Sequence, residues 1–260
     1  MFNIIDRLVT TRKYLLISMI MLFSLNATAS EIAHIKFDIL RSYPFAYIDN
    51  EDNKVGTFWQ YVGLISRKSN LEIDRRIVPK ARVVANLKSG STDAAILFKA
   101  SHLDHHVEYI TMVRSIPIII ATQKGTLIDT YEDLRQLKTI GIFRSGSINP
   151  EFDNDKSINK KTVSSYPSLV KMLGSKRLDA IAGNGVVITA LINQLCLQDT
   201  IDISPLIMGN REQWLVFSKL SGRLGQAEKL NKSIQRLKSE GALDHIFDAH
   251  LSQNKHSCNQ

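Results

Sequence analysis

Short apolar segments alternate with helical segments along most of this sequence, from residue 33 to residue 251. The apolar segments are four to eight residues long, as strands are, and the segments between them carry apolar residues three or four positions apart, as helices do. This alternation favours parallel strands whose sheets are covered by helices. The sequence therefore predicts an α/β fold.

The expected strands are residues 33–40, 71–78, 94–98, 116–121, 139–143, 179–182 and 214–218. The expected helices run from 58 to about 68 and over 82–88, 167–173, 186–197, 224–239 and 243–251. Gly90 and Gly241 follow two of these helices, and glycine readily takes the left-handed conformation that ends a helix.

One sequence pattern occurs twice. Leu87 precedes Asp93-Ala94 with the same spacing that separates Leu173 from Asp179-Ala180. In both places a helix is expected to end in a tight turn, after which the aspartate opens a buried strand. The repeat predicts two similar α/β lobes, and two sheets that face each other place a ligand at the cleft between their strand ends.

The composition excludes several classes of protein. The 260 residues are 44% hydrophobic and 22% charged, which is ordinary globular usage, and a mean hydropathy of -0.07 excludes a polytopic membrane protein. The formal charge is +8, but the basic residues are spread along the chain and form no recognition-helix pattern. We therefore expect no nucleic-acid partner. The sequence also has no phosphate-binding glycine-rich loop, and no cofactor is expected.

The first thirty residues have the pattern of an export signal. Basic residues within 1–13 precede an uncharged apolar run over 14–25, and the small residues Ala27 and Ala29 follow. The pattern predicts a signal peptide over 1–29, cleavage after Ala29 and a periplasmic protein. The apolar run is short for a membrane span, which needs roughly twenty residues, and an uncleaved anchor is the alternative.

Six segments carry a family resemblance through their order and spacing. They are Tyr43-Pro-Phe-Ala-Tyr-Ile-Asp49, Leu87-Lys-Ser-Gly90 with Asp93-Ala94, Tyr131-Glu-Asp-Leu134, Ile140-Gly-Ile142, Ser165-Tyr-Pro-Ser-Leu169 through Leu178-Asp-Ala-Ile181, and Leu237-Lys-Ser-Glu-Gly-Ala-Leu-Asp-His-Ile246. Through them, the chain from residue 41 to residue 251 resembles extracellular solute-binding proteins of family 3, the polar amino acid type.

The resemblance implies a type II periplasmic-binding-protein fold, in which two α/β lobes are joined by two crossing segments and close over a ligand. Carried onto this chain, it places the crossings near residues 113–117 and 212–214. The first lobe would then be residues 30–115 together with 214–260, and the second lobe would be residues 116–213.

The resemblance also implies a function. A monomeric protein would capture a small polar or anionic solute and deliver it to an inner-membrane ABC permease. One alternative is a closed-state signal to a membrane sensor, and another is a dehydratase-like enzyme on the same fold. The sequence shows no Ser-His-Asp order and no evident carboxylate pair, so we expect no enzyme activity. A structural domain that binds nothing is the least favoured reading, because two crossings form a cleft.

Two positions of the resemblance bear on the ligand. Family members that bind amino acids hold the α-carboxylate with an arginine after the strand that here ends at Phe98, and the α-amine with an acidic residue after the strand 179–182. In this chain the first position falls near Leu103 and the second on Asn184. Because both charges of the clamp are missing, the ligand is not expected to be a standard amino acid.

Other side chains are expected at the cleft. The predicted contacts outside the next loop are Tyr43, Phe45, Lys80, Arg82, Phe98, Lys99 and Asn184. Phe45 belongs to the aromatic first loop of the family, and it has core packing as its alternative. Lys80 takes the place of a ligand-stacking aromatic residue, and an exposed lysine at a helix start is its alternative.

The loop Arg144-Ser145-Gly146-Ser147 is the strongest predicted contact. It lies between an expected strand and an expected helix start, where free backbone N–H groups beside a cation form an anion site. The alternative is a helix cap made by Ser145 or Ser147. Replacing Arg144 with alanine is expected to weaken binding without unfolding the protein.

Two further groups of residues need an interpretation. Several imidazoles and carboxylates lie close together between residues 102 and 108, but no remote ligand completes a metal site, and no metal is expected. Cys196 and Cys258 both follow the export signal, and an oxidising compartment permits a disulfide between them. A pair of free thiols is the alternative.

Overall fold

The structure is a computed structural model that describes residues 34–144 and 146–256. Its main sheet has eight strands in the order β4-β1-β5-β10-β6-β9-β7-β8. These are β1 (Ile35–Leu40), β4 (Ile73–Val78), β5 (Ala94–Phe98), β6 (Val107–Gln123), β7 (Ile140–Phe143), β8 (Lys160–Val163), β9 (Ala180–Asn184) and β10 (Ile201–Ser218). The short strands β2 (Tyr47–Ile48) and β3 (Lys54–Val55) pair with each other.

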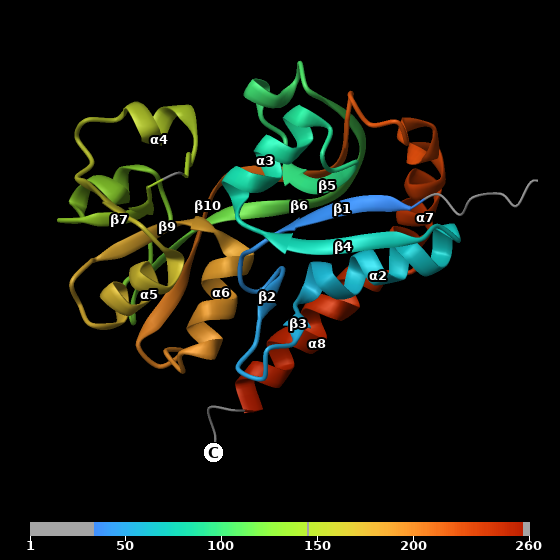
Figure 1. Cartoon of the computed structure of the whole chain (residues 1–260). Coiled ribbons are helices and arrows are strands. Elements are labelled where there is room, and N and C mark those ends of the chain that lie inside the picture. The colour runs from blue at the N-terminus through green and yellow to red at the C-terminus, as the bar shows by residue number, and fades with distance from the viewer. Residues whose placement is uncertain (1–33, 145, 257–260) are drawn as a thin grey trace, which may run out of the picture. The chain divides into compact units, whose positions relative to one another are not determined.

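Helices cover the main sheet (Figure 1). They are α2 (Thr57–Ser69), α3 (Lys80–Ser89), α4 (Pro150–Asn154), α5 (Tyr166–Gly174), α6 (Gly185–Gln194), α7 (Ala227–Ser239) and α8 (Ala242–His256), with short 3-10 turns at Ser101–Leu103, Glu132–Gln136 and Leu224–Gln226. The α3 helix packs on β1, β5 and β10, and α5 packs on β7 and β9. The strands β1, β4 and β5 are parallel, as are β7, β8 and β9. The predicted α/β fold is therefore confirmed.

Two long strands hold the sheet together. The strands β6 and β10 are antiparallel and form a ribbon that crosses the middle of the sheet (Figure 1). One edge of the ribbon, at residues 213–217, pairs with β5, and the other edge, at residues 118–122, pairs with β9. The ribbon therefore joins the first half of the sheet (β4, β1 and β5) to the second half (β9, β7 and β8). The predicted crossings 113–117 and 212–214 lie on it, and the lobe boundaries drawn from them stay predictions.

Each half of the sheet has its own apolar core. The cluster beside α3 includes Leu87 and Val216, and both side chains are fully buried. The cluster of the second half includes Ile120, Ile140 and Phe152, which are also fully buried. Burying one side chain of this size contributes about 1.5–3 kcal/mol, so each half gains stability from packing of its own.

The α8 helix packs on elements from both halves. It contacts α2 and α7, and it also contacts α6, which follows β9. The buried ring of Phe247 on α8 lies 5.9 Å from the ring of Phe45 and 6.3 Å from that of Phe58, measured between centroids. The guanidinium carbon of Arg114, on β6, lies 4.0 Å from the Phe247 centroid. The last helix is therefore anchored to the ribbon as well as to neighbouring helices.

Three predictions fall on parts of the chain that are not described. The export signal over 1–29, its cleavage site after Ala29, and Cys258 lie outside residues 34–256. Within the described part, no helix combines the length and the apolar character needed to cross a bilayer.

Candidate ligand-binding cleft

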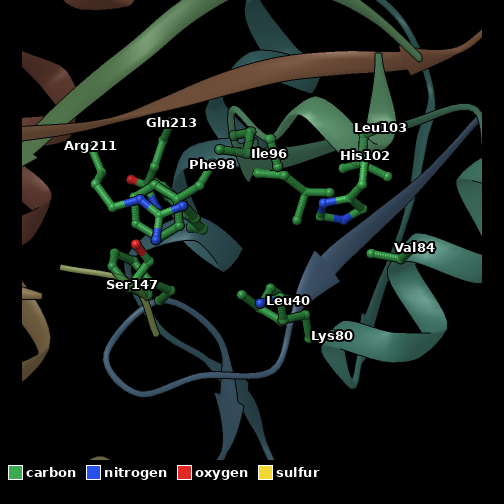
Figure 2. Close-up of a pocket in the computed structure, with 14 residues that line it drawn as sticks. Leu40, Lys80, Val84, Ile96, Phe98, His102, Leu103, Ser147, Arg211 and Gln213 are labelled. Carbon is green, nitrogen blue, oxygen red and sulfur yellow. The ribbon is translucent and has the colours of Figure 1, made fainter. Parts of the chain in front are cut away.

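Two adjoining cavities of about 240 Å³ and about 200 Å³ open where the halves of the sheet meet. They form one cleft, because seven residues line both of them. These shared residues are Leu40, Phe45, Lys80, Phe98, Ser147, Arg211 and Gln213. They come from β1, the loop after it, α3, β5, the loop after β7, and β10, so segments distant in sequence meet here (Figure 2).

The cleft lies at the ends of parallel strands, as the sequence predicted for a ligand site. Leu40, Phe98, Phe143 and Asn184 are the last residues of β1, β5, β7 and β9, and each of them lines one or both cavities. Carboxyl ends of parallel strands from the two halves therefore face a common space, which is the usual position of a ligand in open α/β sheets.

Arg211 is the main cation of the cleft, and it is not among the contacts predicted from the sequence. It lies on β10 opposite Ile116 and is half-buried. Its guanidinium carbon lies 4.9 Å from the centroid of the Phe98 ring, and Figure 2 shows the two side chains together at one side of the cavity. Within the described residues it forms no ion pair. Its position directly before the predicted crossing 212–214 is the sequence signal that could have found it.

The charges around the cleft have one sign. Lys80 lines both cavities and Arg41 lines the second. Together with Arg211, they make three arginine and lysine side chains around the space. No aspartate or glutamate of the described chain lines either cavity. A negatively charged ligand would therefore meet only opposite charge here.

Gln213 is a buried polar group in the same wall. Its side chain lines both cavities, and the residue is only 4% exposed. Its Oε1 atom is buried and accepts no hydrogen bond from the described residues. A buried acceptor oxygen without a hydrogen bond costs free energy, and a hydrogen-bond donor on a ligand in the cleft would offset that cost.

Tyr166 and Asn184 form the wall contributed by the second half. The Tyr166 ring is stacked on Phe143 with centroids 5.2 Å apart, and its hydroxyl oxygen accepts a hydrogen bond of 3.2 Å from the Asn184 N–H. Burial raises the pKa of Tyr166, while the Asn184 N–H and the charge of Arg211 act in the opposite direction. The Asn184 side-chain oxygen accepts a bond of 3.1 Å from the N–H of Val187 and caps α6. Asn184 therefore presents a neutral oxygen that already accepts a hydrogen bond, at the position where the family resemblance implies an acidic residue.

Several residues predicted as ligand contacts lie around this space. Phe45, Lys80, Phe98, Gly146, Ser147 and Asn184 line one or both cavities. Phe45 is also part of the core, because it is 3% exposed and stacked on Phe58 with centroids 5.0 Å apart. Lys80 is exposed at the first residue of α3. Contact between these side chains and a ligand stays a prediction.

Other predicted contacts line neither cavity. The Tyr43 ring packs against Tyr47, with centroids 5.1 Å apart. Lys99 places its ammonium 5.2 Å from the Trp214 ring centroid, and Arg82 is exposed on α3. Ser145 lies outside the described residues. A role for these four residues in binding stays a prediction as well.

The loop after β7 differs from the expected anion site. Arg144 is exposed and lines neither cavity, and its N–H donates to the Val163 carbonyl over 2.9 Å. The Gly146 N–H donates to the Phe143 carbonyl over 2.8 Å, so these two N–H groups are not free. The helix that follows is capped by Asn149 and not by a serine of the loop. The loop reaches the cleft through Gly146 and Ser147 instead.

The histidine-rich segment after β5 reaches the first cavity. Its His102 side chain lines the first cavity beside Leu103, as Figure 2 shows. Over residues 34–144 and 146–256, no three histidine, cysteine, aspartate or glutamate side chains are grouped closely enough to hold a metal ion.

Comparisons with known proteins agree with this geometry. No protein-family model matches the chain. The probable amino-acid-binding protein YxeM of Bacillus subtilis (strain 168) is 21% identical over 220 residues, which cover 82% of each chain. The solved structure of the substrate binding protein of an amino acid ABC transporter superposes with a TM-score of 0.64 at 16% identity, over 84% of this chain and 98% of that one. The VFT2 domain of Bordetella pertussis BvgS gives a TM-score of 0.68 at 16% identity, over 83% and 92%. The chain therefore has the type II periplasmic-binding-protein fold, and it resembles the solute-binding proteins of amino acid ABC transporters.

Proposed function

We propose that this protein captures a small anionic solute in the cleft between the two halves of its sheet. The observation that carries the proposal is the charge of the lining: Arg41, Lys80 and Arg211 surround the space, and no described acidic side chain lines it. A guanidinium that has no carboxylate partner among residues 34–144 and 146–256 is available to bind one bidentately on a ligand.

The cellular role follows from the fold and the first thirty residues. If the predicted export signal directs the protein to the periplasm, a monomer would deliver its solute there to an inner-membrane ABC permease. The similarity to YxeM and to a transporter's substrate binding protein supports this output. A second output, presentation of the closed form to a membrane sensor, is favoured by the similarity to the BvgS domain and to a histidine kinase sensor domain. We propose that the protein binds its solute without converting it.

Isothermal titration calorimetry tests the binding role. The purified protein is titrated with a panel of carboxylates, dicarboxylates, sulfonates, phosphate, amino acids, polyamines and neutral sugars. The proposal expects saturable heat from at least one anion and none from polyamines. Binding of a cation or a sugar in preference to every anion would overturn it, and so would the absence of binding by every anion. Recovery of the titrated anion unchanged by NMR checks that no conversion occurs.

Three arginine variants locate the anion site. Arg211→Gln removes the charge in the cleft, Arg144→Gln removes the charge of the loop after β7, and Arg177→Gln removes an exposed charge that lines neither cavity. The cleft assignment expects at least a tenfold loss of anion affinity for Arg211→Gln, with a melting temperature close to that of the wild type. Arg177→Gln serves as the matched control and is expected to bind normally. A large loss for Arg144→Gln and none for Arg211→Gln would move the site to the loop.

A further inference from the structure

We infer that the solute is an amphipathic anion, with one carboxylate or sulfonate on an apolar body and without an ammonium group. The inference rests on the proposed function, because it names the ligand class of the same cleft. It follows from three features of the described lining: its apolar walls, the grouping of Arg211 with Gln213 on one side of the first cavity, and the lack of any negative charge.

The walls of both cavities are mainly apolar. The apolar side chains include Leu40, Val84 and Leu103 in the first cavity and Ile118, Phe143 and Val187 in the second. A small, fully polar solute would leave these walls without a partner and would lose its own hydration. An apolar body on the ligand would instead bury this surface favourably.

The polar groups of the first cavity are placed unevenly. Figure 2 shows Arg211, Gln213 and Ser147 at one side, whereas Val84 and Leu103 lie at the other side, next to His102. Arg211 and Gln213 are two residues apart on β10, so both side chains project from the same face of one strand. The ring of Phe98 under the guanidinium holds it through a cation–π contact. The Ser147 hydroxyl already donates to the Asp153 carboxylate, and the unpaired Oε1 of Gln213 only accepts hydrogen bonds. Arg211 is therefore the group on this side that can hold a single anionic head, and Gln213 can accept a hydrogen bond from a neutral donor on the same ligand.

An ammonium group would have no partner of opposite charge in the cleft. The side-chain oxygen of Asn184 already accepts a hydrogen bond from the N–H of Val187, and the unpaired Oε1 of Gln213 can accept a hydrogen bond but carries no charge. Arg211 and Lys80 would repel a second positive charge on the ligand. A desolvated ammonium without a carboxylate is costly, so an α-amino acid should bind more weakly than the same acid without its amine.

Matched ligands test this inference directly. The purified protein is titrated with 3-phenylpropanoate, L-phenylalanine, 3-phenyllactate and 3-phenylpropanamide, and in parallel with hexanoate and L-norleucine. The two matched pairs are 3-phenylpropanoate with L-phenylalanine and hexanoate with L-norleucine. Within each pair the apolar body and the carboxylate are the same, and only the amino acid carries an ammonium group. The expected result is that the amine-free acid binds at least tenfold more tightly than the amino acid, and that the amide, which has no charge, binds more weakly than its acid.

The outcomes separate the inference from the proposed function. Tighter binding of the amino acid in both pairs overturns the inference and leaves anion capture standing. Binding of only strongly polar anions, such as phosphate or a short dicarboxylate, also overturns the inference and leaves anion capture standing, because such ligands have no apolar body. If no anion in either panel binds, the proposed function fails together with the inference.

A single substitution should reverse the preference. Asn184→Asp places a carboxylate in the cleft, and aspartate caps a helix as well as asparagine does, so α6 is expected to keep its start. The ratio of phenylalanine affinity to 3-phenylpropanoate affinity is expected to rise at least tenfold. The control is Asn50→Asp, which adds the same charge at an exposed residue that lines neither cavity. If Asn184→Asp melts like the wild type and its affinity ratio is unchanged, the lack of a carboxylate at residue 184 is not the reason that amino acids bind weakly.

Discussion

The carboxylate of Asp179 accepts a hydrogen bond of 2.8 Å from the backbone N–H of Thr139. Asp93 makes the same contact with the N–H of Lys36, also at 2.8 Å. Each aspartate directly precedes a buried strand and binds a residue at or just before the start of the neighbouring parallel strand. The N–H of each aspartate in turn donates to the carbonyl of that same residue. The pattern that occurs twice in the sequence therefore has one physical basis, since it fixes the start of one strand to the next in both halves of the sheet.

Removing either carboxylate should destabilise the protein. Asp93→Ala and Asp179→Ala each leave a backbone N–H without its acceptor, which costs about 1–3 kcal/mol when the group is buried. Asp93 should be the more sensitive position, because it is 8% exposed and also accepts a bond of 2.6 Å from Ser221. Urea unfolding measures both. The exposed Asp74→Ala is the control, and equal midpoints for all three variants would contradict the role given to these aspartates.

Gly56 should be intolerant of any side chain. Its φ is +118°, and a Cβ atom there would lie 2.5 Å from the carbonyl oxygen of Phe45, one of the residues that line both cavities. Gly56→Ala is expected to cost about 1–3 kcal/mol through backbone strain and displacement of that loop. Gly222→Ala is the matched control, since no atom lies within 4 Å of the added methyl group. Thermal unfolding of the two variants compares them, and equal melting temperatures would refute the prediction.

Asp155 should make stability depend on pH in the acid range. Hydrogen bonds from the hydroxyl and N–H of Ser157, at 2.6 and 2.8 Å, together with Arg135, lower the pKa of Asp155 from its ordinary 3.8 to about 2. A lowered pKa in the folded state stabilises the protein above pH 3.8, and this contribution is lost as the pH falls through about 2. Melting temperatures of the wild type and Asp155→Asn should therefore converge between pH 4 and pH 2. A difference that stays constant over this range would exclude the carboxylate as its source.

The predicted disulfide can be counted directly. Cys196 follows α6 and is not a free thiol in the described structure, and its predicted partner Cys258 lies beyond α8. Thiol titration of the denatured, unreduced protein is expected to find no free thiol. Reduction should lower the stability by about 4 kcal/mol, the value for a loop of about sixty residues in the entropic model. A count of two thiols would end the prediction.

The strands and helices could be predicted only in part from the sequence. Apolar runs predicted the strand at 94–98 without error, and the periodicity of Phe58, Val62 and Ile65 predicted α2. The segments 116–121 and 214–218 were identified as short strands, but they are the buried ends of the long strands β6 and β10. The remaining residues of the ribbon are partly exposed, so they lack the apolar run that marks a buried strand. The short elements α4 and β8 were missed because five and four residues give too little periodicity.

Site residues could be predicted from the sequence where a local pattern determines the strand that carries them. They could not be predicted where their position depends on how distant strands pair. Phe98 and Asn184 end strands that their own apolar residues announce, and both line the cleft. Arg211 lies in a stretch without such a signal, and its position depends on the register that sets it opposite Ile116. Register between distant strands is a tertiary property, so the charge that dominates the cleft is visible only in the folded chain.

The placement of α8 has a consequence for any rotation of one half of the sheet against the other. Two strands of the ribbon connect the halves covalently, and α8 adds a third attachment, because it packs on α2 and α7 as well as on α6. A rotation would have to slide α6 along α8 or carry α8 away from α2. The resistance of the protein to such a rotation is therefore set partly by its last helix, and a chain shortened at Gly241 would lose that attachment.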